Sequence, residues 1–167
     1  MASPHAGPYH RCMSMEAGRQ PITSNGSATS PAAVVEAFLK AMQEEDIEAA
    51  MALVDDDIAY TNVSLPTLHG KGRMEKFLAG LDRPQLGFEV YIHAMSTEGS
   101  TVLTERTDVL IFGSVRVQLW VCGRFDVHDG RITIWRDYFD WFALTKGVLR
   151  GLVGAVVPAL GPKPPRS

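Results

Sequence analysis

The chain has 167 residues, of which 46% are hydrophobic, and its 16 lysines and arginines against 19 aspartates and glutamates give a net charge of −3. This length and composition predict one globular domain with a substantial core, and the charge argues against nucleic acid as a partner. Two cysteines cannot form a disulfide framework and are typical of a reducing compartment, so we expect a cytoplasmic protein. The chain is also too short for a complete α/β-hydrolase and lacks a Gly-x-Ser-x-Gly motif.

Both ends of the chain are predicted to lie outside the folded domain. Residues 1–29 carry scattered prolines, glycines and serines without apolar periodicity, which predicts a disordered leader, and they lack the apolar stretch of a secretory signal. Residues 158–167 are rich in proline and are expected to form a flexible tail. The folded domain should therefore cover residues 30–157.

Three helices and one strand are predicted for the N-terminal half of this domain. Ser30 followed by Pro31 is typical of a helix start, and apolar residues recur at helical spacing from there to about Glu44. Asp46 is expected to cap a second, shorter helix, and the run Asp55-Asp56-Asp57 should form a solvated turn after it. The remaining elements of this half are a strand near residues 58–64 and a helix near residues 72–81.

Four further strands follow in meander order. They are predicted near residues 88–92, 103–112, 115–127 and 131–139. Gly113-Ser114 is typical of a two-residue hairpin turn of type II′. Helices followed by antiparallel strands predict an α+β fold, a cone in which a curved, mainly antiparallel sheet is closed by N-terminal helices around an apolar pocket.

The strand at residues 115–127 indicates which face of the sheet is buried, because its odd positions are apolar and its even positions mostly polar. The two-residue turn pairs Phe112 with Val115, and cross-strand partners share a face. Arg106 and Asp108 are therefore expected on the apolar side. Charged side chains there are costly unless they are paired, and such positions are often functional. The competing interpretation is an exposed cross-strand ion pair.

The orientation of the last strand depends on the loop before it. If residues 128–130 form a three-residue loop, Asp137 faces inward together with Trp135 and Phe139. If Asp129-Gly130 alone forms the turn, Asp137 faces outward. The apolar pattern of the strand is compatible with either loop.

A set of five polar residues, in this order and beside these apolar neighbours, resembles the limonene-1,2-epoxide hydrolase family. The five are Tyr60 and Asn62 in the early strand, Arg106 and Asp108 in a middle strand, and Asp137 in the sequence Trp-Arg-Asp-Tyr-Phe. The resemblance covers residues 30–155, and a mycobacterial member of the family is among the proteins that the chain resembles. It implies the cone fold of the wider nuclear-transport-factor-2-like and ketosteroid-isomerase-like superfamily.

The resemblance implies hydrolysis of an epoxide in one step, without a covalent intermediate. Asp137 would be the general base that takes a proton from water, and Tyr60 and Asn62 would hold the same water. Asp108 would be the general acid that protonates the epoxide oxygen, with Arg106 between the two carboxyls. No metal or organic cofactor is expected, since the histidines are scattered over separate elements without ligand spacing.

The expected substrate is a lipophilic small-molecule epoxide, because the predicted pocket lining is apolar. The lining residues are Leu110, Phe112, Leu119, Val121, Trp135 and Phe139. Trp120 would be exposed on the outer face of the sheet, so we expect a homodimer through that face. Residues 148–160 are apolar but too short to span a membrane. They form either a terminal helix packed on the core, a dimer contact or a membrane-surface contact.

Two other classes of function fit the same fold. An isomerase or cyclase would use one buried carboxylate with a hydroxyl donor, but Arg106 between two carboxylates would then have no purpose. A non-catalytic module that binds a hydrophobic ligand would need no inward charges. A diol product, exchange of a proton next to a carbonyl, or binding without turnover would distinguish the three.

Overall fold

The computed structural model describes residues 29–80, 85–157, 159 and 161–163. Almost all of the predicted leader and most of the predicted tail therefore lie outside the described residues. The elements within them, in chain order, are α1 (Pro31–Gln43), α2 (Ile47–Ala52), β1 (Val54–Asn62), β2 (Leu68–His69), α3 (Lys71–Ala79), β3 (Leu86–Glu98), β4 (Thr101–Phe112), β5 (Val115–His128), β6 (Arg131–Tyr138) and α4 (Trp141–Val156).

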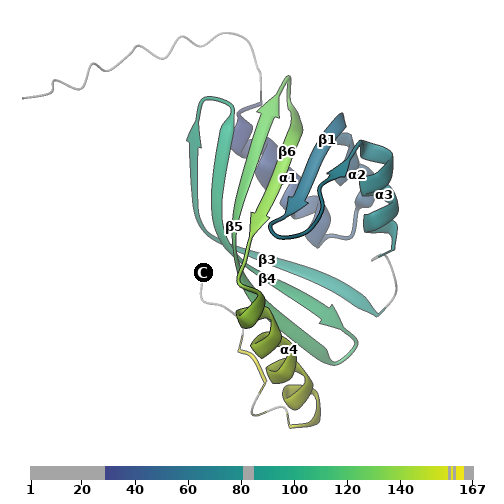
Figure 1. The fold of residues 1–167 in the computed structure, drawn as a ribbon, viewed down its shortest axis with the longest axis vertical. Helices are drawn as coiled ribbons and strands as arrows, with labels where there is room; N and C mark the ends of the chain where they lie inside the picture. Colours follow the sequence, from purple (N-terminus) through teal and green to yellow (C-terminus); the bar gives the residue numbers. More distant parts are fainter. Residues whose placement is uncertain (1–28, 81–84, 158, 160, 164–167) are drawn as a thin grey trace, which may run out of the picture.

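The strands form one six-stranded sheet in the order β2-β1-β6-β5-β4-β3. β1 runs parallel to β6, and the other neighbouring strands are antiparallel. Figure 1 shows α1, α2 and α3 gathered on one side of the curved sheet, and the core lies between these helices and the sheet. The predicted α+β cone is confirmed.

The first two helices begin where their capping residues predict. The Ser30 hydroxyl accepts a hydrogen bond from the N–H of Ala33 at 3.3 Å, and proline occupies the first helical position. The Asp46 carboxylate accepts one from the N–H of Ala49 at 2.9 Å. Both caps supply an acceptor to backbone donors that have no partner inside the helix.

The first strand begins earlier than predicted. β1 starts at Val54, which is fully buried and pairs with Ile132 of β6. The prediction of a solvated turn at Asp55-Asp56-Asp57 was wrong, because the buried valine holds the acidic run in the sheet. The register between Val54 and Ala59 is irregular, and the carboxylates of this stretch lie toward solvent. The short strand β2 was not predicted, since two residues are too few to show alternation.

The hairpin between β4 and β5 has the predicted two-residue turn. Gly113 has a φ of 60°, a conformation that favours glycine, and Phe112 pairs with Val115. The same register pairs Arg106 with Val121 and so places the arginine on the inner face.

The hairpin between β5 and β6 has the shorter of the two loops that the sequence allowed. His128 pairs with Arg131 across the two-residue turn Asp129-Gly130, whose φ values of 49° and 75° are both positive, as in a type I′ turn. The register then shifts by one residue, because Thr133 has no partner on β5. This β-bulge returns Asp137 to the inner face, opposite to the outcome expected for a two-residue turn.

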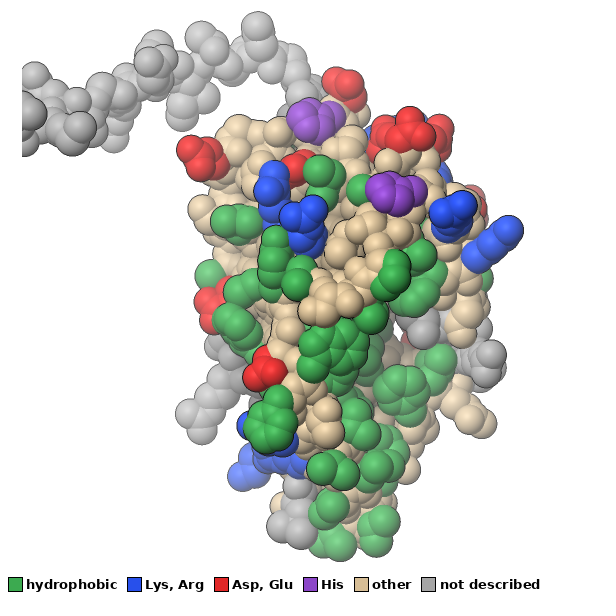
Figure 2. Space-filling view, in the orientation of Figure 1, with side chains coloured by type: hydrophobic (Ala, Val, Ile, Leu, Met, Phe, Trp, Pro, Cys, Tyr) green, Lys and Arg blue, Asp and Glu red, His purple; other side chains and the backbone are tan. Residues whose placement is uncertain are grey.

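The helix α4 packs along the part of β5 that β6 leaves uncovered, since β6 pairs with β5 only from Cys122 onward. Gly147 and Gly151 make this close approach, because a Cβ on Gly151 would lie 2.5 Å from the carbonyl oxygen of Arg116. The opposite side of α4 is exposed, and Figure 2 shows hydrophobic side chains gathered over it. None of the described helices is long and apolar enough to cross a membrane.

Deletion of Thr133 tests the importance of the bulge. The shortened β6 would turn Trp135 and Asp137 toward solvent, so we expect loss of cooperative thermal unfolding, followed by circular dichroism. Thr133→Ala is the control, because it keeps the chain length and removes only the 3.1 Å bond from Thr133 Oγ1 to the Asp126 carbonyl, worth about 1 kcal/mol. Equal melting temperatures for the two variants would contradict this account.

Candidate active site

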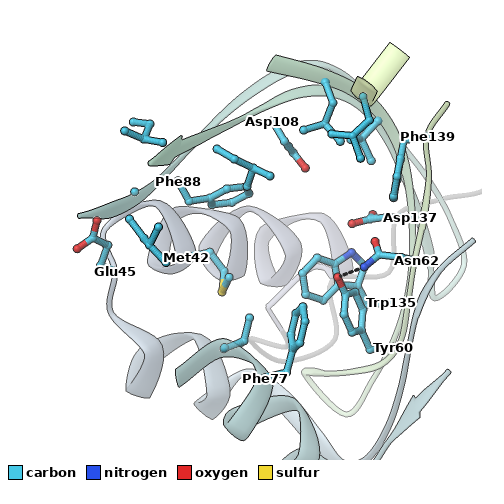
Figure 3. A pocket seen from close by; sticks show the side chains of 18 of the residues that line it. Met42, Glu45, Tyr60, Asn62, Phe77, Phe88, Asp108, Trp135, Asp137 and Phe139 are labelled. Carbon is cyan, nitrogen blue, oxygen red and sulfur yellow. Dashed lines mark hydrogen bonds between the residues drawn. The ribbon is translucent and has the colours of Figure 1, made fainter. Parts of the chain in front are cut away.

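Three strands bring the candidate residues together on the inner face of the sheet. β4 carries Arg106 and Asp108, and β1 pairs in parallel with β6 so that Tyr60 lies beside Trp135 and Asn62 beside Asp137. Figure 3 shows the polar groups of Tyr60, Asn62, Asp108 and Asp137 directed into one cavity. All five residues predicted for the site are therefore neighbours in the structure.

The Arg106 guanidinium is fully buried and bridges the two carboxyls. Its Nε donates to Asp108 Oδ1 at 2.9 Å, and its Nη2 donates to Asp108 Oδ2 at 3.1 Å and to Asp137 Oδ2 at 2.7 Å. Its Nη1 donates to the Thr104 hydroxyl at 3.1 Å. The planar guanidinium thus compensates two buried carboxyls at once, a geometry that lysine could not reproduce. The alternative of an exposed ion pair at Arg106 is excluded.

Room for this guanidinium comes from Gly123 on β5. A Cβ at Gly123 would clash with Nη1 of Arg106 and would lie 2.7 Å from the Thr104 hydroxyl. Sequence reasoning missed both Gly123 and Thr104. The glycine carries a signal, since a glycine inside a strand often marks the close approach of another group.

Burial governs protonation in this array. It raises the pKa of Asp108 to about 6, against the opposite effect of Arg106, and the nearby Asp137 carboxyl raises it further. Burial likewise raises the pKa of Asp137. One arginine and two carboxyls have no net charge when the carboxyls share one proton, and a buried site favours that state.

Tyr60 and Asn62 are joined by a hydrogen bond in which Asn62 Nδ2 donates to Tyr60 Oη at 2.7 Å. The amide oxygen of Asn62 remains an acceptor, and the Tyr60 hydroxyl keeps its proton to donate. Burial and the nearby carboxyls raise the pKa of Tyr60, so it stays a neutral phenol. Asp137 Oδ1 is buried and has no hydrogen-bond partner among the described residues. The Tyr60 hydroxyl therefore lies at the same end of the cavity as two acceptors, the amide oxygen of Asn62 and Asp137 Oδ1.

The cavity has a volume of about 300 Å³, and its walls are mainly apolar. All six predicted lining residues contribute to it: Leu110, Phe112, Leu119, Val121, Trp135 and Phe139. Sequence reasoning missed the contributions of the helices and of β3, which include Met42, Phe77, Phe88 and Leu144. Arg106 lies behind the two carboxyls and does not line the cavity. In the part of the chain that the structure describes, no cluster of His, Cys, Asp and Glu residues is suited to hold a metal ion.

The curved sheet, with its helices on one side and polar groups inside an apolar cavity, defines a cone of the nuclear-transport-factor-2-like class. A solved NTF2-like protein of unknown function from Cytophaga hutchinsonii has this fold, with a TM-score of 0.58 at 18% identity over 71% of this chain and 97% of that chain. At this identity the likeness concerns the fold alone.

More specific matches identify the family. The model of the limonene-1,2-epoxide hydrolase catalytic domain matches residues 29–150. Epoxide hydrolase EphG of Mycobacterium tuberculosis is 53% identical over 126 residues, which cover 75% of this chain and 84% of that protein. The solved structure of an M. tuberculosis LEH-like epoxide hydrolase has a TM-score of 0.75 and 50% identity, over 78% of this chain and 93% of that chain. The chain belongs to the limonene-1,2-epoxide hydrolase family, as the sequence resemblance predicted.

Arg106→Gln tests the role of the guanidinium. The substitution leaves two buried carboxyls without their cation, so we expect the free energy of unfolding in denaturant to fall by about 3–5 kcal/mol. Burial raises the folded-state pKa of both carboxyls above the unfolded value, so ionising them lowers stability as the pH rises. The loss should therefore be larger at about pH 8 than at about pH 5.

The matched control is Arg124→Gln on β5. Arg124 also donates two hydrogen bonds to one carboxylate, that of Asp126, but its side chain is 42% exposed. The control should therefore cost far less stability. Equal losses in the two variants would show that Arg106 is not the cation on which the buried carboxyls depend.

Proposed function

We propose that this protein is an epoxide hydrolase that converts a lipophilic epoxide to a vicinal diol by direct attack of water. The observation that carries the proposal is the pair of buried carboxyls bridged by Arg106, beside a tyrosine and an asparagine with free polar groups, in an apolar cavity. Membership of the limonene-1,2-epoxide hydrolase family and 53% identity to a named epoxide hydrolase support it.

Asp137 is the general base, because it is the carboxyl that adjoins the water-holding pair. Its Cα partner across the parallel β1–β6 ladder is Asn62. A water molecule there donates one hydrogen to Asp137 Oδ1 and the other to the amide oxygen of Asn62, and it accepts the Tyr60 O–H. Its second lone pair then points to an epoxide carbon, so three groups orient the attack.

Asp108 is the general acid. Burial raises its pKa to about 6, closer to neutral pH than that of an ordinary aspartate, which is the direction a general acid requires. It exchanges one of its bonds with Arg106 for a bond to the epoxide oxygen and donates its proton as the carbon–oxygen bond breaks. Apolar lining, including Leu110, Leu119 and Phe88, surrounds the remainder of a lipophilic substrate.

Arg106 keeps the charge balanced during the reaction. Before attack the negative charge lies on Asp137 and the proton on Asp108; after attack the two are exchanged. Because the guanidinium contacts both carboxyls, the negative charge moves from one side of the cation to the other and no net charge is created in the buried site. Return of the proton from Asp137 to Asp108 restores the starting state.

The test is a single turnover in ¹⁸O-labelled water with a panel of lipophilic epoxides. Direct attack puts solvent oxygen into the diol at the first turnover, and Asp137→Asn should slow the reaction by roughly 10²–10⁴-fold. Asp126→Asn is the matched control, since Asp126 is a buried aspartate that bonds to Arg124 and Thr101 and does not line the cavity. It should react at the wild-type rate.

Three outcomes would contradict the proposal in different ways. Unlabelled diol at the first turnover would indicate a covalent intermediate on the enzyme. Exchange of a proton next to a carbonyl, with no diol from any epoxide, would indicate the isomerase or cyclase alternative. Binding of apolar ligands without turnover would indicate the ligand-binding alternative.

We also propose that two copies associate through the outer face of the sheet. Trp120 is 53% exposed there, and its indole N–H donates to the Glu105 carboxylate at 3.1 Å. Leu103 and Tyr138 are exposed on the same face. Sedimentation at micromolar concentration should give the mass of a dimer, and Trp120→Glu should give a monomer. A monomeric wild-type protein would contradict the proposal. We further propose that the protein is cytoplasmic, because two cysteines without a disulfide framework are typical of a reducing compartment.

A further inference from the structure

The Trp135 indole N–H is a buried donor that the mechanism above does not use. Trp135 is 5% exposed and lines the cavity, and its Nε1 has no hydrogen-bond acceptor within the described ranges. Asp137 lies two residues further along β6, on the same face. Its Oδ1 is a buried acceptor that likewise has no hydrogen-bond partner among the described residues. A donor and an acceptor without partners, each costly to bury alone, thus lie at one end of one cavity.

Packing alone does not account for a tryptophan at this position. The ring contacts Tyr60, Phe38 and Phe125 with centroid distances of 4.3, 5.1 and 5.9 Å. A phenylalanine would make apolar contacts of the same kind without burying a polar group. The feature that tryptophan adds is the indole N–H.

The arginine does not bind the two carboxyls equally. Arg106 donates two hydrogen bonds to Asp108 but one to Asp137. Hydrogen bonds stabilise the charged form of a carboxyl, so this count alone would ionise Asp108 and leave the shared proton on Asp137. That distribution is the reverse of the one that the proposed reaction needs. One further donor to Asp137 would make the two counts equal, and the attacking water, which also donates to Asp137 Oδ1, would then give Asp137 the larger count.

We propose that Trp135 is a positioning residue whose indole N–H donates to Asp137 Oδ1, so that the shared proton resides on Asp108 and the base is ionised. The inference rests on the proposed epoxide hydrolysis. The attacking water cannot be the acceptor of this N–H, because one of its lone pairs accepts from Tyr60 and the other attacks the epoxide. With Arg106 on Oδ2 and Trp135 on Oδ1, the carboxylate is held at both ends.

The electrostatics of Asp137 agree with this arrangement. The indole of Trp135 lowers the pKa of Asp137, as Arg106 does, against the larger effect of burial. The other titratable groups that face it are Asp108 from β4 and Tyr60 from β1, and Tyr60 stays neutral.

The first test needs no substrate. The chain has three tryptophans, so a ¹H–¹⁵N spectrum should contain three indole signals, and Trp135→Phe assigns the one of interest. That signal should titrate with the buried carboxyls and shift in Asp137→Asn. The signals of Trp120, which bonds to Glu105, and Trp141 should not change in Asp137→Asn. A Trp135 signal that responds neither to pH nor to Asp137→Asn would overturn the inference.

The second test is the pH dependence of hydrolysis by Trp135→Phe. Loss of the donor should raise the apparent pKa of the acid limb of the kcat profile by about one unit. At pH values below that pKa, turnover should therefore be roughly tenfold slower than in the wild type, with little change in KM. Trp141→Phe, on the exposed helix α4, should keep the wild-type profile. An unmoved acid limb, or a change in KM alone, would overturn the inference.

The two tests separate this inference from the proposed function. If Trp135→Phe fails to fold, the wild-type spectrum and that of Asp137→Asn still decide whether the hydrogen bond exists. If the wild-type protein hydrolyses no epoxide, the proposed function fails, and the indole titration still reports whether Trp135 and Asp137 are joined.

Discussion

One buried guanidinium between two carboxyls is the interaction on which the rest of the structure depends. Arg106 cannot lose its charge, and it is fully buried, so the fold must supply a negative charge to compensate it, which Asp108 and Asp137 provide between them. Gly123 leaves the space that the guanidinium occupies, and the bulge in β6 turns Asp137 toward it. The charged triad therefore joins β4 to β6 across β5, and its net charge is set by one shared proton.

Local patterns predicted much of this site. Alternation along β5 and the turn at Gly113 were sufficient to place Arg106 and Asp108 on the inner face, because the rule that cross-strand partners share a face transmits orientation from one strand to the next. The capping residues Ser30 and Asp46 likewise predicted where the first two helices begin. Each of these inferences uses only residues that are close in the sequence or joined by a short turn.

Other features depend on interactions that no local pattern records. The two-residue turn at Asp129-Gly130 was one of the two loops that the sequence allowed, and it alone would turn Asp137 outward. The bulge at Thr133 turns Asp137 inward again, and nothing in the composition of β6 marks the extra residue. The acidic run after Val54 looked like a turn because its charge was apparent and its pairing with β6 was not. The helical lining of the cavity, such as Met42, follows from how the helices dock on the sheet.

The parallel pairing of β1 with β6 has a consequence for folding. It joins Tyr60 and Asn62, near the start of the domain, to Trp135 and Asp137, near its end. Contacts so distant in the sequence form slowly, because the entropy cost of closing a long loop comes before any stabilisation from the contacts. On a growing polypeptide, β1 to β5 emerge while Arg106 and Asp108 still lack their third partner. The group of polar residues should thus be complete only when the last strand has joined the sheet.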